Sequence, residues 1–457
     1  MRPRRLLFVS LLLILIGLAA AGYFYFKGSG ILPQHAAPPS ASATLNDPAV
    51  IKIIEQYRQK VQTDPTSSTA WGELGMVFDI HYETKPAIEC YRQAMKLDDK
   101  DARWPYLLAS KLDRSGGSES DEAIRLFQTA VDVKAPSQSY RTVALLSLAD
   151  LLTELGRGDE AAPLYEKAYS ADLSNAWAAY RMAMLLFKRG ESDRAARIMF
   201  SLAPNPQARK KSAVAMAEIS RKLGKVKDAE GFDYAAGLLP PDENWANPFT
   251  APLVELRRGR RALMDRFGQL ESAQSEREAV KTANALADQY PSVETQIILL
   301  RSLVGAGEYP AAVAVADDIL RDENGKQLVN AHSFLGLARL GLADRAEAEG
   351  RKGETDRLLN QAVEALRESV RLKPDFALGY IYLSKALLRL GKLPEAEAAA
   401  RSAMSSRPEE WEGYLSLVDV LAAAGRKPEA MKIAEQAIKL AHPNEPRPKQ
   451  ALENLKK

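Results

Sequence analysis

Apolar residues recur through most of this chain with the three- and four-residue spacing of one helix face. Trp71, Leu74 and Phe78 have this spacing, and so do Ala87 and Tyr91 after an interruption of polar residues. Side chains at that spacing lie on one side of a helix, whereas a half-buried strand requires strict alternation. The pattern therefore predicts short amphipathic helices that follow one another in pairs.

Two neighbouring stretches of the chain are nearly the same. Residues 391–396 read Gly-Lys-Leu-Pro-Glu-Ala, and residues 425–430, which lie 34 positions later, read Gly-Arg-Lys-Pro-Glu-Ala. A fixed period of this length indicates a stacked repeat protein in which each unit is a pair of helices. Gly391 stands where a helix needs a left-handed residue at its C-terminal end. Pro394 stands where the next helix can begin without a backbone donor.

The same period extends through the chain and places small residues at fixed positions. Gly156, Gly190 and Gly224 follow one another at 34-residue intervals, each between the two helices of a pair. In the first pair, Leu74-Gly75 lies within the first helix. The first helix of the pair carries a large residue, then Leu-Gly, then an aromatic residue, and the second helix carries small residues and an aromatic residue. This arrangement resembles the tetratricopeptide repeat family.

The resemblance implies an all-α fold, a right-handed α-solenoid of about ten helix pairs whose first helices line a concave groove. We expect an N-terminal array over residues 49–241, an insertion or hinge at 242–259, and a C-terminal array over 260–445. A polar helix is expected at 446–457. One unit is longer than the others because of the extra residues 341–354, and we expect both of its helices to be lengthened.

Residues 6–26 form an almost uninterrupted apolar run. A helix of that length spans roughly 31 Å, close to the hydrocarbon thickness of a bilayer. Arginines are concentrated before the run, within residues 1–5, and Lys27 is the only charge in the twenty residues after it. The positive-inside rule therefore predicts a single-pass signal-anchor, with the N-terminus in the cytoplasm and the array outside, in the periplasm or cell envelope if the protein is bacterial.

A cleaved signal peptide is the alternative interpretation of this segment. Residues 19–21 are three alanines and offer a small-residue cleavage site, in which case the protein would be secreted. Both interpretations place the folded part outside the cytoplasm. Residues 27–48 are rich in proline, alanine and serine, and we expect them to form a flexible linker.

Composition and motifs argue against catalysis. The chain has 62 basic and 59 acidic residues, a net charge of +3, one cysteine and four histidines. This balance provides no overall field that attracts nucleic acid, and a single cysteine excludes an intrachain disulfide or a multi-cysteine metal site. No nucleotide-binding loop, nucleophile elbow or zinc-protease motif occurs. We expect a non-enzyme with no cofactor, no metal and no nucleic-acid partner, while the oligomeric state stays open.

The candidate site lies on two successive first helices, where the family's geometry implies which side chains point into the groove. One helix contributes an unusually apolar set, Trp177, Tyr180, Met184 and Phe187. The next contributes a mixed set, Lys211, Glu218 and Arg221. We predict that this part of the groove binds an apolar or aromatic side chain of a partner protein or peptide. The alternative is that the stripe packs against the linker, the 242–259 segment or a second copy of the chain.

The sequence therefore favours a membrane-anchored scaffold that mediates protein–protein interactions on the extracytoplasmic side through its concave face. Two other functions stay open. An accessory cell-envelope protein that binds glycan or cell-wall polymer would carry a row of exposed aromatic rings in the groove. A catalytic function within residues 242–259 would need a buried polar cluster there.

Overall fold

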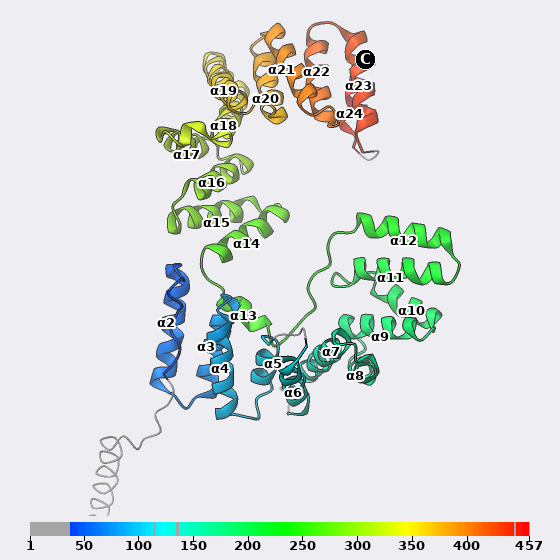
Figure 1. Cartoon of the computed structure of the whole chain (residues 1–457). Helices are drawn as coiled ribbons and strands as arrows, with labels where there is room; N and C mark the ends of the chain where they lie inside the picture. Colours follow the sequence, from blue (N-terminus) through cyan, green and yellow to red (C-terminus); the bar gives the residue numbers. More distant parts are fainter. Residues whose placement is uncertain (1–36, 113–115, 134–136, 443–444, 457) are drawn as a thin grey trace, which may run out of the picture. The chain divides into compact units, whose positions relative to one another are not determined.

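The computed structural model describes residues 37–112, 116–133, 137–442 and 445–456. These residues form 23 α-helices, α2 to α24, and no strand occurs among them. The all-α prediction is therefore confirmed. The chain divides into two compact units, unit 1 up to Gly259 and unit 2 from Arg260 onward. Figure 1 shows that successive helices within each unit stack beside one another in chain order.

Unit 1 contains five helix pairs, and we call the first helix of each pair the A helix and the second the B helix. Its A helices are α3 (Ser68–Ile80), α5 (Arg103–Ala109), α7 (Gln138–Glu154), α9 (Ala176–Lys188) and α11 (Arg209–Lys222). Its B helices are α4 (Thr84–Leu97), α6 (Ser118–Asp132), α8 (Gly158–Ala171), α10 (Ser192–Leu202) and α12 (Val226–Leu238). The pairs are preceded by α2 (Pro48–Thr63) and followed by the short α13 (Ala251–Leu256).

Unit 2 also contains five pairs. Its A helices are α14 (Arg260–Ser272), α16 (Val293–Gly305), α18 (Val329–Ala348), α20 (Ala377–Arg389) and α22 (Trp411–Ala423). Its B helices are α15 (Glu276–Gln289), α17 (Tyr309–Arg321), α19 (Lys352–Leu372), α21 (Leu393–Ser406) and α23 (Lys427–Leu440). A last helix, α24 (Arg447–Lys456), packs on α22 and α23. The expected lengthening of one unit is confirmed, because α18 and α19 have 20 and 21 residues where α20 and α21 have 13 and 14.

The turn from the A helix to the B helix has the same geometry in most pairs. Gly391 has the left-handed φ of +71° that the repeat predicts, and Gly156 has +77°. The N–H of Lys392 then donates to the carbonyl of Leu387 at 3.0 Å, which satisfies an otherwise unpaired carbonyl at the helix end. In two turns the left-handed residue is not glycine: Tyr82 has φ +65° and Gln274 has φ +54°.

Small residues allow the helices of a pair to approach closely. A Cβ added at Gly75 would lie 2.7 Å from the ring of Tyr91, and one added at Gly336 would lie 2.5 Å from the side chain of Leu366. Ala396 is fully buried, with an exposed fraction of 0%. Larger side chains at such positions would overpack the core, so the spacing of glycine and alanine determines which faces of the helices can meet.

The predicted membrane segment, residues 6–26, lies outside the described residues. Among the helices that the structure does describe, none is both long enough and apolar enough to cross a bilayer. The last part of the expected linker is described and makes contacts: the Ser42 hydroxyl donates to Glu83 at 2.9 Å, and the Arg58 guanidinium donates to the Pro38 carbonyl at 3.4 Å. The end of this segment is therefore attached to unit 1.

The chain between α12 and unit 2 returns along unit 1. Residues 242–259, which we call the strap, begin beside α11 and end where Gly259 lies against Asp47 and Val50, at the first helix of the unit. Within the strap, α13 packs on α3, and Figure 1 shows the connecting chain running back from α12 to α13. The segment expected to be an insertion or hinge is thus packed into unit 1.

Candidate partner-binding surface

The A helices of unit 1 together present one surface, which we call the A-helix face, and the strap lies on it. From its N-terminal end, the strap contacts α11, then α9, then α7 and α5, and finally α3. It therefore crosses the stack in the reverse of chain order. An extended segment in this position can offer successive side chains to successive repeats, which is how stacked repeats bind a linear ligand.

The strap begins with a carboxylate that caps α11. The Asp242 side chain accepts hydrogen bonds from the backbone N–H groups of Lys210 at 2.8 Å and Lys211 at 2.9 Å, and from the Lys211 ammonium at 3.1 Å. Only 3% of this side chain is exposed. Burial by itself would raise the pKa of Asp242, but the three hydrogen bonds outweigh it and hold the pKa below its usual value. The carboxylate therefore binds as an anion.

Trp245 of the strap lies against the predicted aromatic residues. Its ring is parallel to that of Trp177, with centroids 6.2 Å apart and planes 3° apart, and it lies 5.9 Å from the ring of Tyr180. The Lys211 ammonium lies 5.0 Å from the centroid of the Trp245 ring. Aromatic ring pairs at these separations stabilise a contact by more than the burial of their surface alone, and a cation over an indole ring stabilises it further.

The middle of the strap is its most deeply buried part. The Phe249 ring is 1% exposed and stacks on Tyr106, with centroids 3.7 Å apart, while Tyr140 meets the same ring edge-on at 4.8 Å. The Asn247 amide donates to the Tyr106 hydroxyl at 2.8 Å, and that hydroxyl lies 2.9 Å from the hydroxyl of Ser147. This region of the strap belongs to the main core of unit 1.

The C-terminal end of the strap is held by a histidine. The backbone N–H of Arg258 lies 3.0 Å from Nε2 of His81, and Nδ1 of His81 lies 2.7 Å from the Val77 carbonyl. Because a backbone N–H donates and a carbonyl accepts, the ring must be neutral with its proton on Nδ1. Burial lowers the pKa of His81 below its usual value, which agrees with a neutral ring.

The structure brings some of the predicted site residues together and separates others. Trp177, Tyr180 and Lys211 meet at Trp245, and Met184 lines a cavity next to Tyr180. Phe187 is buried, with the Lys222 ammonium 4.7 Å from its ring centroid. Arg221 forms an ion pair with Asp233 on α12, and Glu218 is exposed. Three of the seven residues therefore form one contact region with the strap.

A cavity of about 370 Å³ lies beside this region, between α7, α8 and α9. Its polar wall is a network centred on Asp150, which accepts a hydrogen bond from the Tyr165 hydroxyl at 2.6 Å and pairs with Arg181 at 2.8 Å. Burial raises the pKa of the Tyr165 phenol, and the Asp150 charge raises it further. The Asp150 carboxylate thus joins α8 and α9 and orders the wall of the cavity, while Nε of Arg181 is buried without a partner among the described residues.

Unit 2 has a second candidate surface, formed by α20, α22 and α24. A cavity of about 400 Å³ there is lined by apolar residues together with Lys385, Asp419 and Trp411. The guanidinium of Arg447, on α24, lies 4.4 Å from the centroid of the Trp411 ring. Desolvation by the surrounding side chains raises the pKa of Asp419, and Lys385 opposes that shift. This surface combines apolar walls with basic and acidic side chains.

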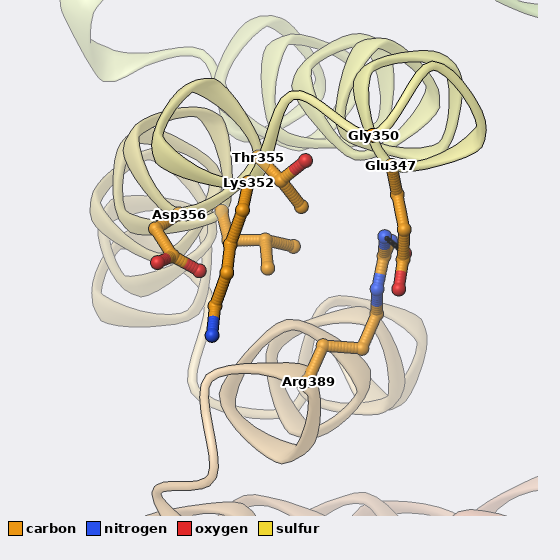
Figure 2. Close-up of a pocket in the computed structure, with 7 residues that line it drawn as sticks. Glu347, Gly350, Lys352, Thr355, Asp356 and Arg389 are labelled. Carbon is orange, nitrogen blue, oxygen red and sulfur yellow. Dashed lines mark hydrogen bonds and ion pairs between the residues drawn. The ribbon is translucent and has the colours of Figure 1, made fainter.

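A third hollow, of about 420 Å³, lies where the lengthened pair meets α20. Figure 2 shows Lys352 and Asp356 on one side of it and Glu347 and Arg389 on the other. Arg389 is already paired with Asp344 and Glu347, each at 2.5 Å. The hollow thus lies beside the lengthened helices, and the Arg389 guanidinium on its wall is already ion-paired with two acidic side chains.

The sequence did not predict a binding role for the strap residues or for the surface of unit 2. Trp245 and Phe249 were visible as aromatic residues in a segment without a repeat, where Pro248 and Pro252 prevent a continuous helix. The unit 2 residues could have been found by applying the groove positions of the first five pairs to the last two. Those positions give Lys385 on α20 and Asp419 on α22.

Comparison with known proteins supports the repeats. Models of the tetratricopeptide repeat match residues 152–219 in unit 1, and 112–176, 356–404 and 383–446 across both units. The chain therefore carries tetratricopeptide repeats in unit 1 and in unit 2, which confirms the predicted class of repeat. No curated protein matches the chain.

Several solved structures resemble parts of the chain. A tetratricopeptide repeat protein of Thermus thermophilus, TTC0263, is 19% identical, with a TM-score of 0.38, over 43% of this chain and 98% of that one. PilF of Pseudomonas aeruginosa is 21% identical, with a TM-score of 0.35, over 40% and 82%. YrrB, described as having an unusual peptide-binding site, is 15% identical, with a TM-score of 0.34, over 40% and 91%.

Proposed function

We propose that this protein is a membrane-anchored, non-catalytic scaffold that captures extended segments of other proteins outside the cytoplasm. The observation that carries the proposal is the strap itself, because the A-helix face of unit 1 already holds an extended peptide. The strap binds through a capped carboxylate, stacked rings and an amide-to-hydroxyl hydrogen bond. A segment of another protein can make every one of these contacts.

The anchor and the orientation rest on the sequence before the described residues. An apolar run at 6–26 with arginines on one side only is the pattern of a segment that stays in the bilayer and directs the export of the chain after it. Secretion after cleavage near residues 19–21 is the alternative. Either arrangement would present the repeats to partners on the extracytoplasmic side.

Two features of the described residues support binding rather than catalysis. No group of three or more His, Cys, Asp or Glu side chains among them could hold a metal ion. Cys90 is fully buried, and that burial raises the pKa of its thiol, whereas a nucleophilic cysteine needs a lowered pKa and access to solvent. The described residues therefore offer neither a cluster of metal-binding side chains nor an activated cysteine.

Glycan binding is the less favoured alternative. A sugar-binding surface needs aromatic faces that are free to receive the ligand. In unit 1, the faces of Trp177 and Tyr180 meet Trp245 of the same chain. The aromatic residues of this surface therefore already bind a peptide, which favours a protein partner.

Two experiments test this proposal. Protease added to intact cells after permeabilisation of the outer layer should digest the repeats, and resistance would place them in the cytoplasm. Crosslinked capture from the membrane should then be compared between the wild type, Trp177→Ala combined with Tyr180→Ala, and a Tyr234→Ala control, which changes an aromatic residue that is 69% exposed on α12. We expect only the double variant to lose its captured partners. An unchanged set would reject the A-helix face as the capture site.

A further inference from the structure

The strap has two halves that differ in burial. Phe249 and Leu253 are 1% and 4% exposed and belong to the main core of unit 1. Trp245 is only half-buried and packs against a separate core cluster, and its neighbours Glu243 and Asn244 are exposed. This half is held by polar contacts: the Asp242 side chain, 3% exposed, caps α11, and the Glu243 N–H donates to the Pro206 carbonyl at 3.0 Å. The first half, residues 242–246, can therefore leave the A-helix face while the second half keeps the core closed.

The site beneath the first half needs an anion. The helix α11 begins with Arg209, Lys210 and Lys211 and has no acidic residue in its first turn. Three cationic residues at the positive end of a helix dipole repel one another and the dipole, so this helix start is unfavourable without a carboxylate. Asp242 supplies that carboxylate, and whatever replaces the strap must supply another.

The Lys211 side chain contacts both the carboxylate and the aromatic ring of the strap. The Lys211 ammonium lies 3.1 Å from the Asp242 carboxylate and 5.0 Å from the centroid of the Trp245 ring. These two strap residues are three positions apart in the chain. An extended peptide with the same spacing would place its own acid and its own ring on the same ammonium, so Lys211 selects for that spacing.

The strap does not satisfy the whole surface. The indole N–H of Trp177 is buried, and no described residue accepts its hydrogen bond. A buried donor without an acceptor is costly, so a ligand that brings a carbonyl or carboxylate oxygen to this point gains a bond that the strap does not make. With the strap in place, one buried donor of Trp177 thus has no acceptor among the described residues.

We propose that residues 242–246 are a built-in competitor for a partner segment of the same chemistry. That segment is an extended peptide with a carboxylate side chain followed three residues later by an aromatic side chain. It binds where Asp242 and Trp245 now lie, and it displaces the first half of the strap. This inference rests on the proposed function and names the class of partner.

The test uses a fluorescent peptide with the sequence of residues 241–247, Pro-Asp-Glu-Asn-Trp-Ala-Asn, and the full-length protein. Peptide binding is measured by fluorescence anisotropy against the wild type, Trp245→Ala, and Trp245→Ala combined with Lys211→Ala. A tethered competitor acts at millimolar effective concentration, so we expect Trp245→Ala to bind the peptide at least about tenfold more tightly than the wild type. The added Lys211→Ala change should remove this gain.

Two matched controls accompany this measurement. Tyr234→Ala should bind the peptide as weakly as the wild type does. A peptide with asparagine and alanine in place of the acid and the tryptophan should not bind Trp245→Ala. Thermal unfolding of each variant, measured alongside, separates loss of the surface from loss of the fold.

Three results would overturn the inference: equal affinity for the wild type and Trp245→Ala, no binding to any variant that is folded, or dimerisation of Trp245→Ala that fills the surface with a second copy. These failures differ from failure of the proposed function. If partner capture still requires Trp177 and Tyr180 while the peptide never binds, the scaffold stands and the partner chemistry is wrong. If substitution of both residues leaves partner capture unchanged, the scaffold proposal fails at this surface.

Discussion

The ring of Phe249 lies parallel to the ring of Tyr106, with centroids 3.7 Å apart and planes 7° apart, although the two residues are far apart in the sequence. The hydroxyl of Tyr106 also receives the Asn247 amide, so one tyrosine fixes the strap through a stack and a hydrogen bond. The strap is therefore part of the core at this point and a surface ligand further back, at Trp245.

Removal of the buried ring should destabilise unit 1. We expect Phe249→Ala to lower the free energy of unfolding by about 3–5 kcal/mol, because it deletes a large side chain that is 1% exposed and leaves a cavity beside Tyr106. Denaturant unfolding monitored by circular dichroism measures this change. Val254→Ala on α13 is the control, since Val254 is 65% exposed and its loss should change stability by less than about 0.5 kcal/mol. Similar effects of the two variants would contradict a buried anchor.

The strap's C-terminal contact should weaken in mild acid. His81 accepts the Arg258 N–H only when neutral, and burial lowers the pKa of His81 in the folded protein, with Asp47 opposing that shift and Arg257 adding to it. A released histidine titrates near about 6.5. The contribution of this contact is therefore complete above that pH and is lost as the pH falls through it toward the lower folded value, with a slope of at most about 1.4 kcal/mol per pH unit.

The pH dependence can be isolated by comparison with His81→Gln, whose amide cannot titrate. We expect the difference in unfolding free energy between the wild type and this variant to be constant above about pH 7 and to change as the pH falls below about 6.5, the value for a released histidine. Hydrogen exchange at the Arg258 amide should accelerate over the same range in the wild type only, after correction for the intrinsic rate. A difference that does not depend on pH would show that His81 does not hold the strap.

Two helix turns are strained at residues where glycine should be better. Tyr82 and Gln274 occupy left-handed backbone conformations, which cost about 1–2 kcal/mol for an L-residue with a side chain, and Tyr82 is 59% exposed. We expect Tyr82→Gly and Gln274→Gly each to stabilise the protein by about 0.5–1 kcal/mol, since the entropy of glycine in the unfolded chain offsets part of the gain. Gly391→Ala, the reverse change at an unstrained turn, should destabilise by about 1 kcal/mol. Thermal unfolding distinguishes the stabilisation expected of the two glycine substitutions from the destabilisation expected of Gly391→Ala.

The need for small residues between packed helices can be tested within one helix. Ala396 on α21 is fully buried, whereas Ala398 two residues later is exposed. We expect Ala396→Leu to destabilise unit 2 by about 1–3 kcal/mol through overpacking. Ala398→Leu adds the same side chain on the solvent side and should leave the unfolding curve within about 0.5 kcal/mol of the wild type. If Ala396→Leu is also neutral, the small residue is not required for close helix packing.

The repeats could be predicted from the sequence because their determinants are local. A left-handed glycine such as Gly391 and a small residue such as Ala396 act within one helix pair, so their spacing alone identifies the turn and the packed face. The lengths of α18 and α19 followed from the same frame, since residues beyond the repeat had to be placed somewhere within that pair.

The strap could not be predicted in the same way, because its contacts join residues far apart in the chain. Nothing within residues 242–259 indicates that Phe249 will meet Tyr106 or that Trp245 will meet Trp177. The sequence did identify Trp177, Tyr180 and Lys211 as exposed by their own repeats, and packing against the 242–259 segment was one of the alternatives. Which segment covers them depends on the path of the whole unit.

Site-specific photo-crosslinking from Tyr180 tests the central claim most directly. With Tyr180 replaced by p-benzoylphenylalanine in the full-length protein, the wild-type strap should be crosslinked within residues 242–249, as peptide mass spectrometry would detect. With Trp245→Ala added, we expect these internal crosslinks to fall and crosslinks to an acidic, aromatic segment of another protein to rise. Internal crosslinks that are absent from the outset, or that are unchanged by Trp245→Ala, would contradict a displaceable strap on the A-helix face.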